Sequence, residues 1–449
     1  MRPRNDVPTL FMELTDQIID HLHADRAALQ TCSLVCRSWQ PAARFHLFNT
    51  MSACPEKCPF NELIAFLATT DDVAQHIMHF SLSGYRGISF ADLESLLSSL
   101  TRLRTLTMDG LYISTSLSPY PVVQPEMVVP ALAALNIKDC NVIDHGVDIF
   151  FRLLSYFGDI DTLRLSTWKN FSTYRGMEGL DELEGRIGYI LPSHVRVTNL
   201  AFTSIPLHFL RQLCHPWSRP FWAFISGLSV EHRSISWDYV KQLGKVFAAP
   251  DTQLRRVSLM ASQKLIVPDR GDHGTGILGL AALAAAFQDA QLPPVPDGPR
   301  DTTKEWKALR LEHCTTLDVF TVTLDHMDRD GHRRGREIFS TTVDLLTHVP
   351  SCVRQVRVKM VPHLDVNAIQ FGLGETPRRK VLLEALDWQA LDKVLSVPRF
   401  KDLTVTLEIV RSRGHSRKKC VEIVNNIRGE LPLLFERGML AVEVRDENE

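Results

Sequence analysis

The sequence lacks an excess of charge of either sign. Its 449 residues carry 50 Lys and Arg against 52 Asp and Glu, which gives a formal net charge of −2. A dedicated nucleic-acid-binding protein usually has a clear basic excess, so we expect no such role for the chain as a whole. With 45% hydrophobic and 23% charged residues, the composition predicts a soluble globular protein. The length implies two or more domains or a repeat array.

Long apolar runs are also missing. The nearest, Ile277–Phe287, is too short to span a bilayer and predicts a buried, Ala-rich helix. The N-terminus has no apolar region of the kind that signal peptides contain. Nine cysteines are scattered along the chain, and we expect them to be free thiols in a reducing compartment. These features predict a cytoplasmic and/or nuclear protein with no membrane partner.

Motifs of common catalytic sites are absent as well. There is no G-x-S-x-G and no H-E-x-x-H, and the glycine cluster at Arg270–Gly279 lacks the lysine of a phosphate-binding loop. The segment His326–Glu337 comes close to a calcium loop, but its first ligand position is His326, where a hard cation prefers a carboxylate. We therefore expect a charged turn there, no cofactor, no metal and no enzyme activity. A zinc or thiol hydrolase is kept as a third hypothesis, which metal analysis of the purified protein would decide.

Two cysteine pairs have a spacing close to that of a four-cysteine zinc site. They are Cys32 with Cys36, and Cys54 with Cys58. Residues four apart on a helix share one face, so the first pair is poorly shaped for a zinc knuckle and both thiols should pack as small apolar groups. We therefore interpret Cys32 and Cys36 as core residues and the second pair as part of a linker.

The N-terminal segment shows helical periodicity. Phe11, Leu14, Ile18 and Leu22 form an apolar stripe, and Leu29, Cys32 and Cys36 form a second one. Asp25 is suited to cap the second helix. Pro41 should break or restart the helix, and a third short helix should follow it. Three helices in so few residues bury little apolar area. The stripes and Trp39 should therefore either form a protein interface or pack on the next domain, and periodicity leaves both open.

Within this segment, "LFMELTDQIIDHLHADRAALQTCSLVCRSWQPAARFHLF" resembles an F-box of the type common in fungal proteins. The matching residues are Leu10, Glu13, Leu14, Ile18, Leu22, Asp25, Leu29, Val35, Cys36, Arg37 and Trp39. Phe11 stands where the family usually has proline, and Pro41 falls in the third helix. The resemblance covers less than a tenth of the chain.

The resemblance implies a function without catalysis. F-box proteins dock onto the small Skp-type adaptor subunit of a cullin–RING (SCF-type) ubiquitin ligase, and the rest of the chain presents a protein substrate. By this analogy the partner-binding residues are Leu10, Leu14, Ile18, Leu22, Leu29, Val35 and Trp39. The identity of the substrate is beyond what the sequence indicates.

The remainder of the chain repeats a helical stretch followed by a strand-like run. The runs are His79–Gly84, Leu103–Gly110, Leu132–Cys140, Ile160–Trp168, Val195–Ser204, Ile225–His232, Leu254–Ser262, Trp306–Cys314, Val353–Met360, Leu403–Val410 and Leu440–Glu447. Several spacings match leucine-rich repeats of about 20–29 residues. We expect an α/β fold, with an F-box at 8–50, a linker helix region at 51–75 and an irregular leucine-rich-repeat-like solenoid at 76–449. A doubly wound α/β domain is the alternative.

Two further interpretations stay open at this point. The basic run Val410–Lys419 should be a solvated hairpin or an inter-repeat loop, although such clusters also serve nuclear localisation. The chain as a whole is expected to be either a ligase adaptor or a repeat scaffold with no ubiquitin role, whose N-terminal helices cap the solenoid. The cap requires Leu10, Leu14 and Trp39 to be buried against residues 60–110.

Overall fold

In the computed structural model the chain has two compact units. Unit 1 is Met1–Ile225 and unit 2 is Ser226–Glu449. The residues that the structure describes are 12–85, 87–114, 131–142, 146–166, 169–170, 195–215, 218–231, 237–249, 252–261, 306–325, 331–361, 387–400, 402–411 and 417–446. Each unit combines helices with parallel strands, so the predicted α/β class is confirmed. The predicted helix at Ile277–Phe287 lies outside the described residues.

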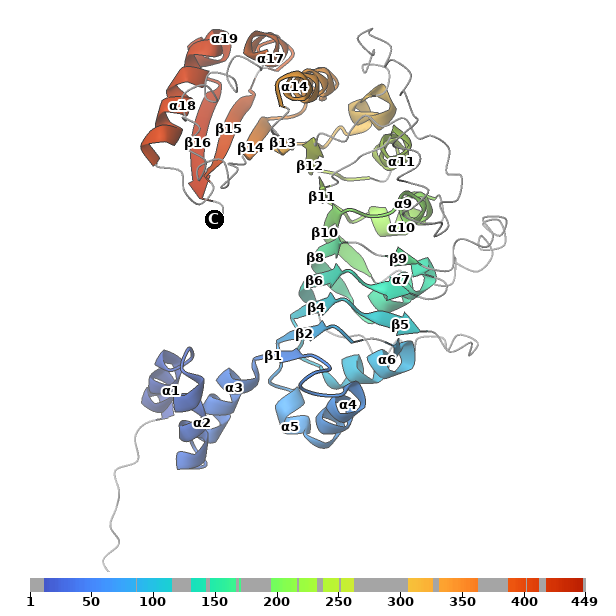
Figure 1. Ribbon diagram of the computed structural model, residues 1–449, viewed down its shortest axis with the longest axis vertical. Coiled ribbons are helices and arrows are strands. Elements are labelled where there is room, and N and C mark those ends of the chain that lie inside the picture. Colours follow the sequence, from blue (N-terminus) through green and yellow to red (C-terminus); the bar gives the residue numbers. More distant parts are fainter. Residues whose placement is uncertain are drawn as a thin grey trace, which may run out of the picture. The chain divides into compact units, whose positions relative to one another are not determined.

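Unit 1 begins with three short helices and continues with strands that alternate with helices (Figure 1). The N-terminal helices are α1 (Met12–His21), α2 (Arg26–Val35) and α3 (Gln40–Phe48). The later helices are α4 (Phe60–Thr69), α5 (Asp71–Ala74), α6 (Phe90–Ser99), α7 (Gly146–Leu154), α9 (Leu207–Leu213) and α10 (Arg219–Trp222). The longer strands are β1 (Thr50–Ala53), β2 (His79–Ser83), β4 (Thr105–Asp109), β6 (Leu132–Lys138), β8 (Asp159–Ser166) and β10 (Arg196–Thr203). The shorter strands are β3 (Ile88–Ser89), β5 (Tyr112–Ser114), β7 (Asn141–Val142) and β9 (Lys169–Asn170).

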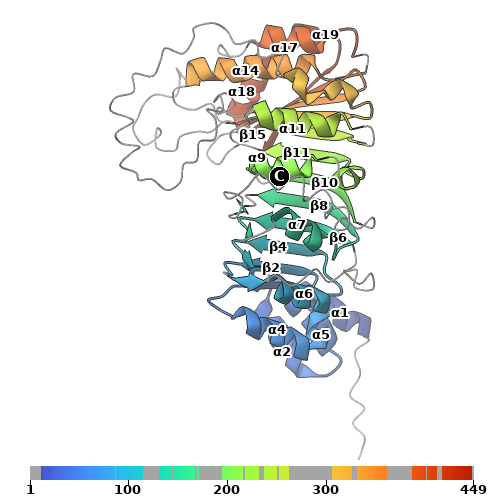
Figure 2. The same ribbon diagram turned by 90° about the vertical axis from the view of Figure 1, so that its right-hand side faces the viewer.

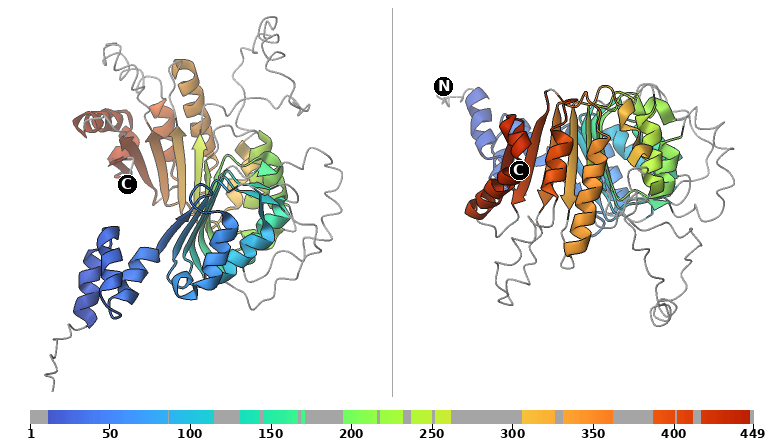
Figure 3. Two further views of the ribbon diagram at one scale, coloured as in Figure 1. Left: turned by 60° about the horizontal axis from the view of Figure 1, so that its bottom comes forward. Right: turned by 90° about the horizontal axis from the view of Figure 1, so that it is seen from above.

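The longer strands of unit 1 form a parallel sheet in the order β1-β2-β4-β6-β8-β10, and Figure 2 shows β2 to β10 side by side. The short strands form a second parallel sheet in the order β3-β5-β7-β9. Side chains alternate along the longer strands. On β4, Leu106 and Met108 are buried and are paired in register with Leu135 and Ile137 of β6. Helices α6 and α7 lie on one side of the strands in Figures 1 and 3, and the polar alternate positions lie on the opposite face of the strands.

One backbone turn recurs at the ends of these strands. A residue with a left-handed φ directly follows four of the strands. These residues are Gly84 after β2 (69°), Gly110 after β4 (68°), Asp139 after β6 (48°) and Ser204 after β10 (56°). The amides of Gly84, Gly110 and Asp139 each donate to the carbonyl of the last residue of the next strand, at 2.9 Å. Glycine has no Cβ to clash in this conformation, and aspartate tolerates it better than most residues. The next residue along the chain is buried in each case: Tyr85, Leu111, Cys140 and Ile205.

Unit 2 repeats the alternation of strand and helix. Its strands are β11 (Gly227–Glu231), β12 (Arg256–Ala261), β13 (Val319–Asp325), β14 (Gln355–Val361), β15 (Thr404–Arg411) and β16 (Leu440–Asp446). They are parallel and lie in this order. The helices are α11 (Trp237–Phe247), α14 (Gly331–Thr347), α17 (Trp388–Leu395), α18 (Arg417–Glu430) and α19 (Pro432–Glu436), with the 3₁₀ turns η5 (Lys307–Leu309) and η6 (Leu311–His313).

In both units the carbonyl oxygen of the residue before a strand accepts hydrogen bonds from two backbone amides at the start of the next strand. In unit 1 the Met78 oxygen accepts from Arg104 and Thr105, at 2.7 and 2.9 Å. In unit 2 the Arg255 oxygen accepts from Asp318 and Val319, at 2.8 and 3.0 Å. A carbonyl has two lone pairs, so one oxygen can satisfy both donors at the start of a strand. This arrangement fixes where each strand begins relative to its neighbour.

Ten of the eleven strand-like runs contain a strand, and the prediction for Trp306–Cys314 is wrong. That run forms η5 and η6, separated by Arg310 with a φ of 52°. Its Leu309, Leu311 and Cys314 are buried, so the run has the burial expected of a strand without the extended backbone. The strand of this region is β13, whose segment has the β-branched residues that favour extended structure. Part of the predicted loop at Val410–Lys419 is helical, because α18 begins at Arg417.

Two helical glycines of unit 2 provide a matched test of this packing. A Cβ on Gly244 of α11 would lie 1.7 Å from the Ala308 carbonyl oxygen of η5, whereas a Cβ on Gly429 of α18 meets nothing within 4 Å. We expect Gly244→Ala to lower the free energy of unfolding by about 2 kcal/mol or more, because the backbone of η5 must move. Gly429→Ala should raise it by up to about 1 kcal/mol through helix propensity. Urea denaturation followed by circular dichroism measures both, and an equal effect of the two variants would contradict the close contact of α11 with η5.

Candidate functional site

The three N-terminal helices share a small apolar core. Its buried members are Ile19 of α1, Leu29 and Cys32 of α2, and Ala43 of α3. Leu22, Trp39, Ala42 and Leu47 pack against these four and are partly buried. Figure 3 shows the three helices, in dark blue, packed together. Four small or medium side chains make a minimal core, and such a unit gains little hydrophobic stabilisation by itself.

Several apolar side chains of these helices face solvent. Leu14 and Ile18 are 48% and 44% exposed, and they lie one turn apart on α1, beside the buried Thr15 and Ile19. At the end of α2, Val35 is 58% exposed and Leu34 is 85% exposed. Large apolar side chains grouped on a surface commonly mark a protein interface. The periodicity of the sequence did not single out Leu34, because this residue falls outside the apolar stripe of its helix.

The seven predicted docking residues therefore fall into different environments. Leu14, Ile18 and Val35 are exposed, whereas Leu22 and Trp39 are half-buried against the helical core. Leu29 is only 1% exposed, so in this conformation it supports the core and offers no contact to a partner. Leu10 lies outside the described residues. The exposed members of the predicted docking set therefore lie on α1 and at the end of α2.

Local capping explains how α2 and α3 are placed. The Asp25 carboxylate accepts the Ala28 amide at 3.0 Å, which confirms the predicted N-cap of α2. Pro41 lies in the first turn of α3, where its missing N–H leaves no helical hydrogen bond unmade. A third short helix is present as predicted, but it begins at Gln40, one residue before Pro41, and α2 has already ended at Val35.

The prediction that Cys36 is a core residue is wrong. Helix α2 ends at Val35, and Cys36 adopts an extended backbone with a φ of −160° and a ψ of 166°. Its side chain is exposed, whereas that of Cys32 is buried. The helical face that joins these two residues in a continuous helix does not exist, because the chain leaves the helix one residue earlier. The Cys36 Sγ lies 3.0 Å from the Ser38 Oγ, and hydrogen bonds from Ser38 and the Trp39 amide lower the pKa of the thiol.

Polar contacts attach α3 to its neighbours. The His46 Nε2 lies 2.7 Å from a carboxylate oxygen of Asp20, which links α3 to α1. The Arg44 guanidinium pairs with Asp72 of α5, and the rings of Phe45 and His76 meet edge to face at 6.4 Å between centroids. Helix α3 thus connects the helical core to the start of the sheet. The exposed apolar side chains lie on α1 and α2 and take no part in these contacts, so they stay accessible to a partner.

The second cysteine pair lies in a turn. The Cys58 amide donates to the Cys54 carbonyl at 3.0 Å, and the Tyr85 hydroxyl donates to the Cys58 carbonyl at 2.6 Å. Burial raises the pKa of Tyr85 to about 12, which keeps its hydroxyl protonated as a donor. In the part of the chain that the structure describes, no group of three or more His, Cys, Asp or Glu side chains could hold a metal ion. The glycine cluster at 270–279 and residues 326–330 lie outside that part. The rest of the predicted charged turn, Gly331–Glu337, is instead helical, because α14 begins at Gly331.

Comparisons with known proteins give no family. No protein-family model matches the chain, and no curated protein matches it. Among the helices of the described residues, none combines the length and the apolar character needed to cross a lipid bilayer.

The difference between the two cysteines of α2 can be measured by alkylation. We expect iodoacetamide to modify Cys36 at least about tenfold faster than Cys32 in the native protein, because the Cys36 thiol is exposed whereas that of Cys32 is buried, and because hydrogen bonds lower the pKa of Cys36 below its ordinary value. Cys140 is an internal reference: it is fully buried, and burial raises its pKa to about 12, so it should react slowest. Mass spectrometry of the digested protein gives the three rates. Equal rates at Cys32 and Cys36 would show that α2 does not end where the structure places its end.

Proposed function

We propose that the chain is a substrate-recognition adaptor of a cullin–RING ubiquitin ligase. The three N-terminal helices dock onto the small adaptor subunit of the ligase, and the sheet-containing remainder binds a protein substrate. The observation that carries the proposal is the exposure of Leu14, Ile18 and Val35, which coincide with docking positions implied by the F-box resemblance. Function then requires no catalytic group, because tethering raises the effective concentration of substrate lysines near the ubiquitin-loaded enzyme.

We further propose that the remainder is a leucine-rich-repeat-like solenoid, in which neighbouring repeats bury one another's apolar faces. The recurring turn of unit 1 supports this: its left-handed residues Gly84, Gly110 and Asp139 follow one another at intervals within the usual repeat length. Each is preceded by a strand of the larger sheet, and each is followed by a short strand of the second sheet. Unit 2 supports the proposal through the same order of parallel strands and the paired amides at strand starts.

The scaffold alternative requires the N-terminal helices to act as a cap. A cap buries Leu14 and Trp39 against residues 60–110. Leu14 is instead half exposed, and Trp39 packs against the core of its own three helices. A terminal cap buries apolar surface against the next repeat, whereas the three N-terminal helices leave apolar side chains exposed to solvent. These environments favour docking over capping.

A charge placed on α1 tests the docking proposal. We expect Leu14→Asp to weaken binding to the Skp-type adaptor subunit by about tenfold or more, because a carboxylate would be desolvated in an apolar contact. Co-purification of the full-length chain with the adaptor subunit, followed by calorimetric titration of the pure components, measures the loss. Folding of the variant should be close to normal because the side chain is exposed.

Phe66→Asp is the matched control. Phe66 is an apolar helical residue of unit 1 that is 40% exposed, but it lies on α4, outside the three N-terminal helices. Its replacement should leave adaptor binding unchanged. Failure of the wild-type chain to bind the adaptor subunit, or an equal loss in the two variants, would reject the proposed function.

A further inference from the structure

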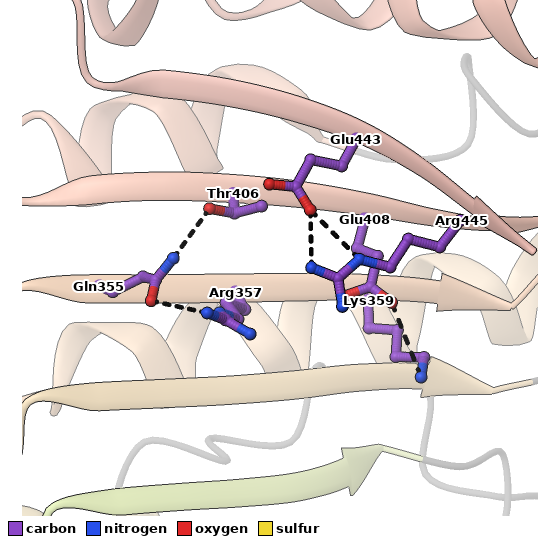
Figure 4. Close-up of polar contacts among 7 residues, drawn as sticks. All are labelled: Gln355, Arg357, Lys359, Thr406, Glu408, Glu443 and Arg445. Atoms are coloured by element: carbon purple, nitrogen blue, oxygen red, sulfur yellow. Dashed lines mark hydrogen bonds and ion pairs between the residues drawn. The ribbon is translucent and has the colours of Figure 1, made fainter. Parts of the chain in front are cut away.

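Seven polar side chains stand on one face of the last three strands of unit 2, and Figure 4 draws them. We call them the polar face: Gln355, Arg357 and Lys359 of β14, Thr406 and Glu408 of β15, and Glu443 and Arg445 of β16. The alternate residues of β14 and β15 point to the other side and are buried, as Val358 and Leu407 show. The side chains of Lys359, Glu443 and Arg445 are 39%, 43% and 43% exposed, so solvent reaches this face.

Four of the charged groups on the polar face are paired with each other. Glu408 and Glu443 stand directly opposite in register, which alone would be repulsive. Lys359 lies opposite Glu408 on the other side, with its Nζ 3.7 Å from a carboxylate oxygen. The Arg445 guanidinium donates to Glu443 at 2.9 and 3.3 Å. Each carboxylate therefore has its own cation.

Arg357 has a different arrangement. Its Nη2 donates to the Gln355 side-chain oxygen at 3.0 Å, and the Gln355 amide nitrogen donates to the Thr406 hydroxyl at 3.2 Å. This chain of neutral groups orients the guanidinium without neutralising it. Its Nε is buried and has no hydrogen-bond partner among the described residues, and the neighbouring carboxylates of Glu408 and Glu443 pair with Lys359 and Arg445. Because Nε is closed to solvent, an incoming acceptor meets the terminal nitrogens of the guanidinium, of which only Nη2 has a hydrogen bond among the described residues.

The residues beside Arg357 in the sheet are small. Its register row runs from Ser258 of β12 through Thr321 of β13 to Arg357, and on to Thr406 and Ala441. No side chain of this row other than Arg357 is longer than threonine. The side chains on both sides of Arg357 in its row are therefore short, and the hydroxyl groups of Ser258, Thr321 and Thr406 offer further donors.

We infer that Arg357 binds a carboxylate side chain of an acidic peptide segment. A planar guanidinium held in place matches a carboxylate geometrically, with two parallel N–H donors. The polar face carries three cations against two carboxylates, so a single negative charge completes the balance. A phosphorylated side chain carries close to two negative charges and fits this balance less well. The inference rests on the proposed function only in naming the acidic segment as part of the substrate. Binding of the segment to Arg357 does not itself require a ligase.

The test uses the full-length protein and fluorescein-labelled peptides in an anisotropy titration at low ionic strength. Poly-glutamate should bind and poly-glutamine should not. Arg357→Gln should weaken binding of poly-glutamate by about tenfold or more, which is the loss expected for charge-assisted hydrogen bonds. Arg357→Lys, which keeps the charge but lacks the two parallel donors, should give an intermediate loss and guards against a folding defect in the first variant.

Arg102→Gln is the control for the change in net charge, because Arg102 is an exposed residue of unit 1, outside the polar face. It should bind poly-glutamate like the wild type. The inference is overturned if poly-glutamate does not bind, if Arg357→Gln and Arg102→Gln behave alike, or if a phosphoserine peptide of equal length binds more tightly. Binding of the same variants to the ligase adaptor subunit is measured in parallel. Arg357→Gln should retain it, so failure at the polar face is distinguishable from failure of the proposed function.

Discussion

Parallel pairing of each strand with its predecessor is the constraint on which the other features of each unit depend. A parallel pair cannot be joined by a tight hairpin, so the chain must cross back over the sheet between strands. In both units the crossing ends where one carbonyl accepts two amides of the next strand. In unit 1 it begins with a left-handed residue such as Gly84 or Gly110. In unit 1, helices α6 and α7 lie on one side of the strands, and the polar positions of the strands lie on the other.

The proposals of docking and of peptide binding rest on two different kinds of surface. The N-terminal helices present apolar side chains because their core is too small to bury them, as Leu14 and Ile18 show. The strands of unit 2 present ordered polar groups, as the hydrogen bonds of Arg357 and Gln355 show. An apolar contact supplies affinity with little geometric demand, whereas an oriented guanidinium supplies selectivity. The proposed adaptor function, with one constant partner and one particular substrate, requires both.

Sequence reasoning located most strands and the N-cap of the second helix, because these depend on local signals. Alternation of apolar residues marks β4 and β15, and Asp25 marks the start of α2. The same alternation misplaced a strand at Trp306–Cys314, where burial repeats without extended backbone.

The side chains of the candidate sites were less accessible to prediction. Exposure of Leu34 and burial of Leu29 depend on how three helices meet, which no single stripe determines. The isolation of Arg357 depends on register across five strands, and neighbours so distant in sequence leave no local pattern. The prediction for Cys36 failed because the helix ends one residue early.

Register within each sheet is independent of the number of residues that separate the strands. Leu82 pairs with Met108 in unit 1, and Leu259 pairs with Val322 in unit 2 across a much longer stretch of chain. Loop-closure entropy grows only with the logarithm of length, so the longer connection costs about 0.8 kcal/mol more than the shorter one. Connecting segments can therefore differ in length while the strands keep their partners. The length of a connecting segment is a weak constraint on the stability of each sheet, whereas the helices in these segments still contribute buried residues such as Leu93 and Leu243.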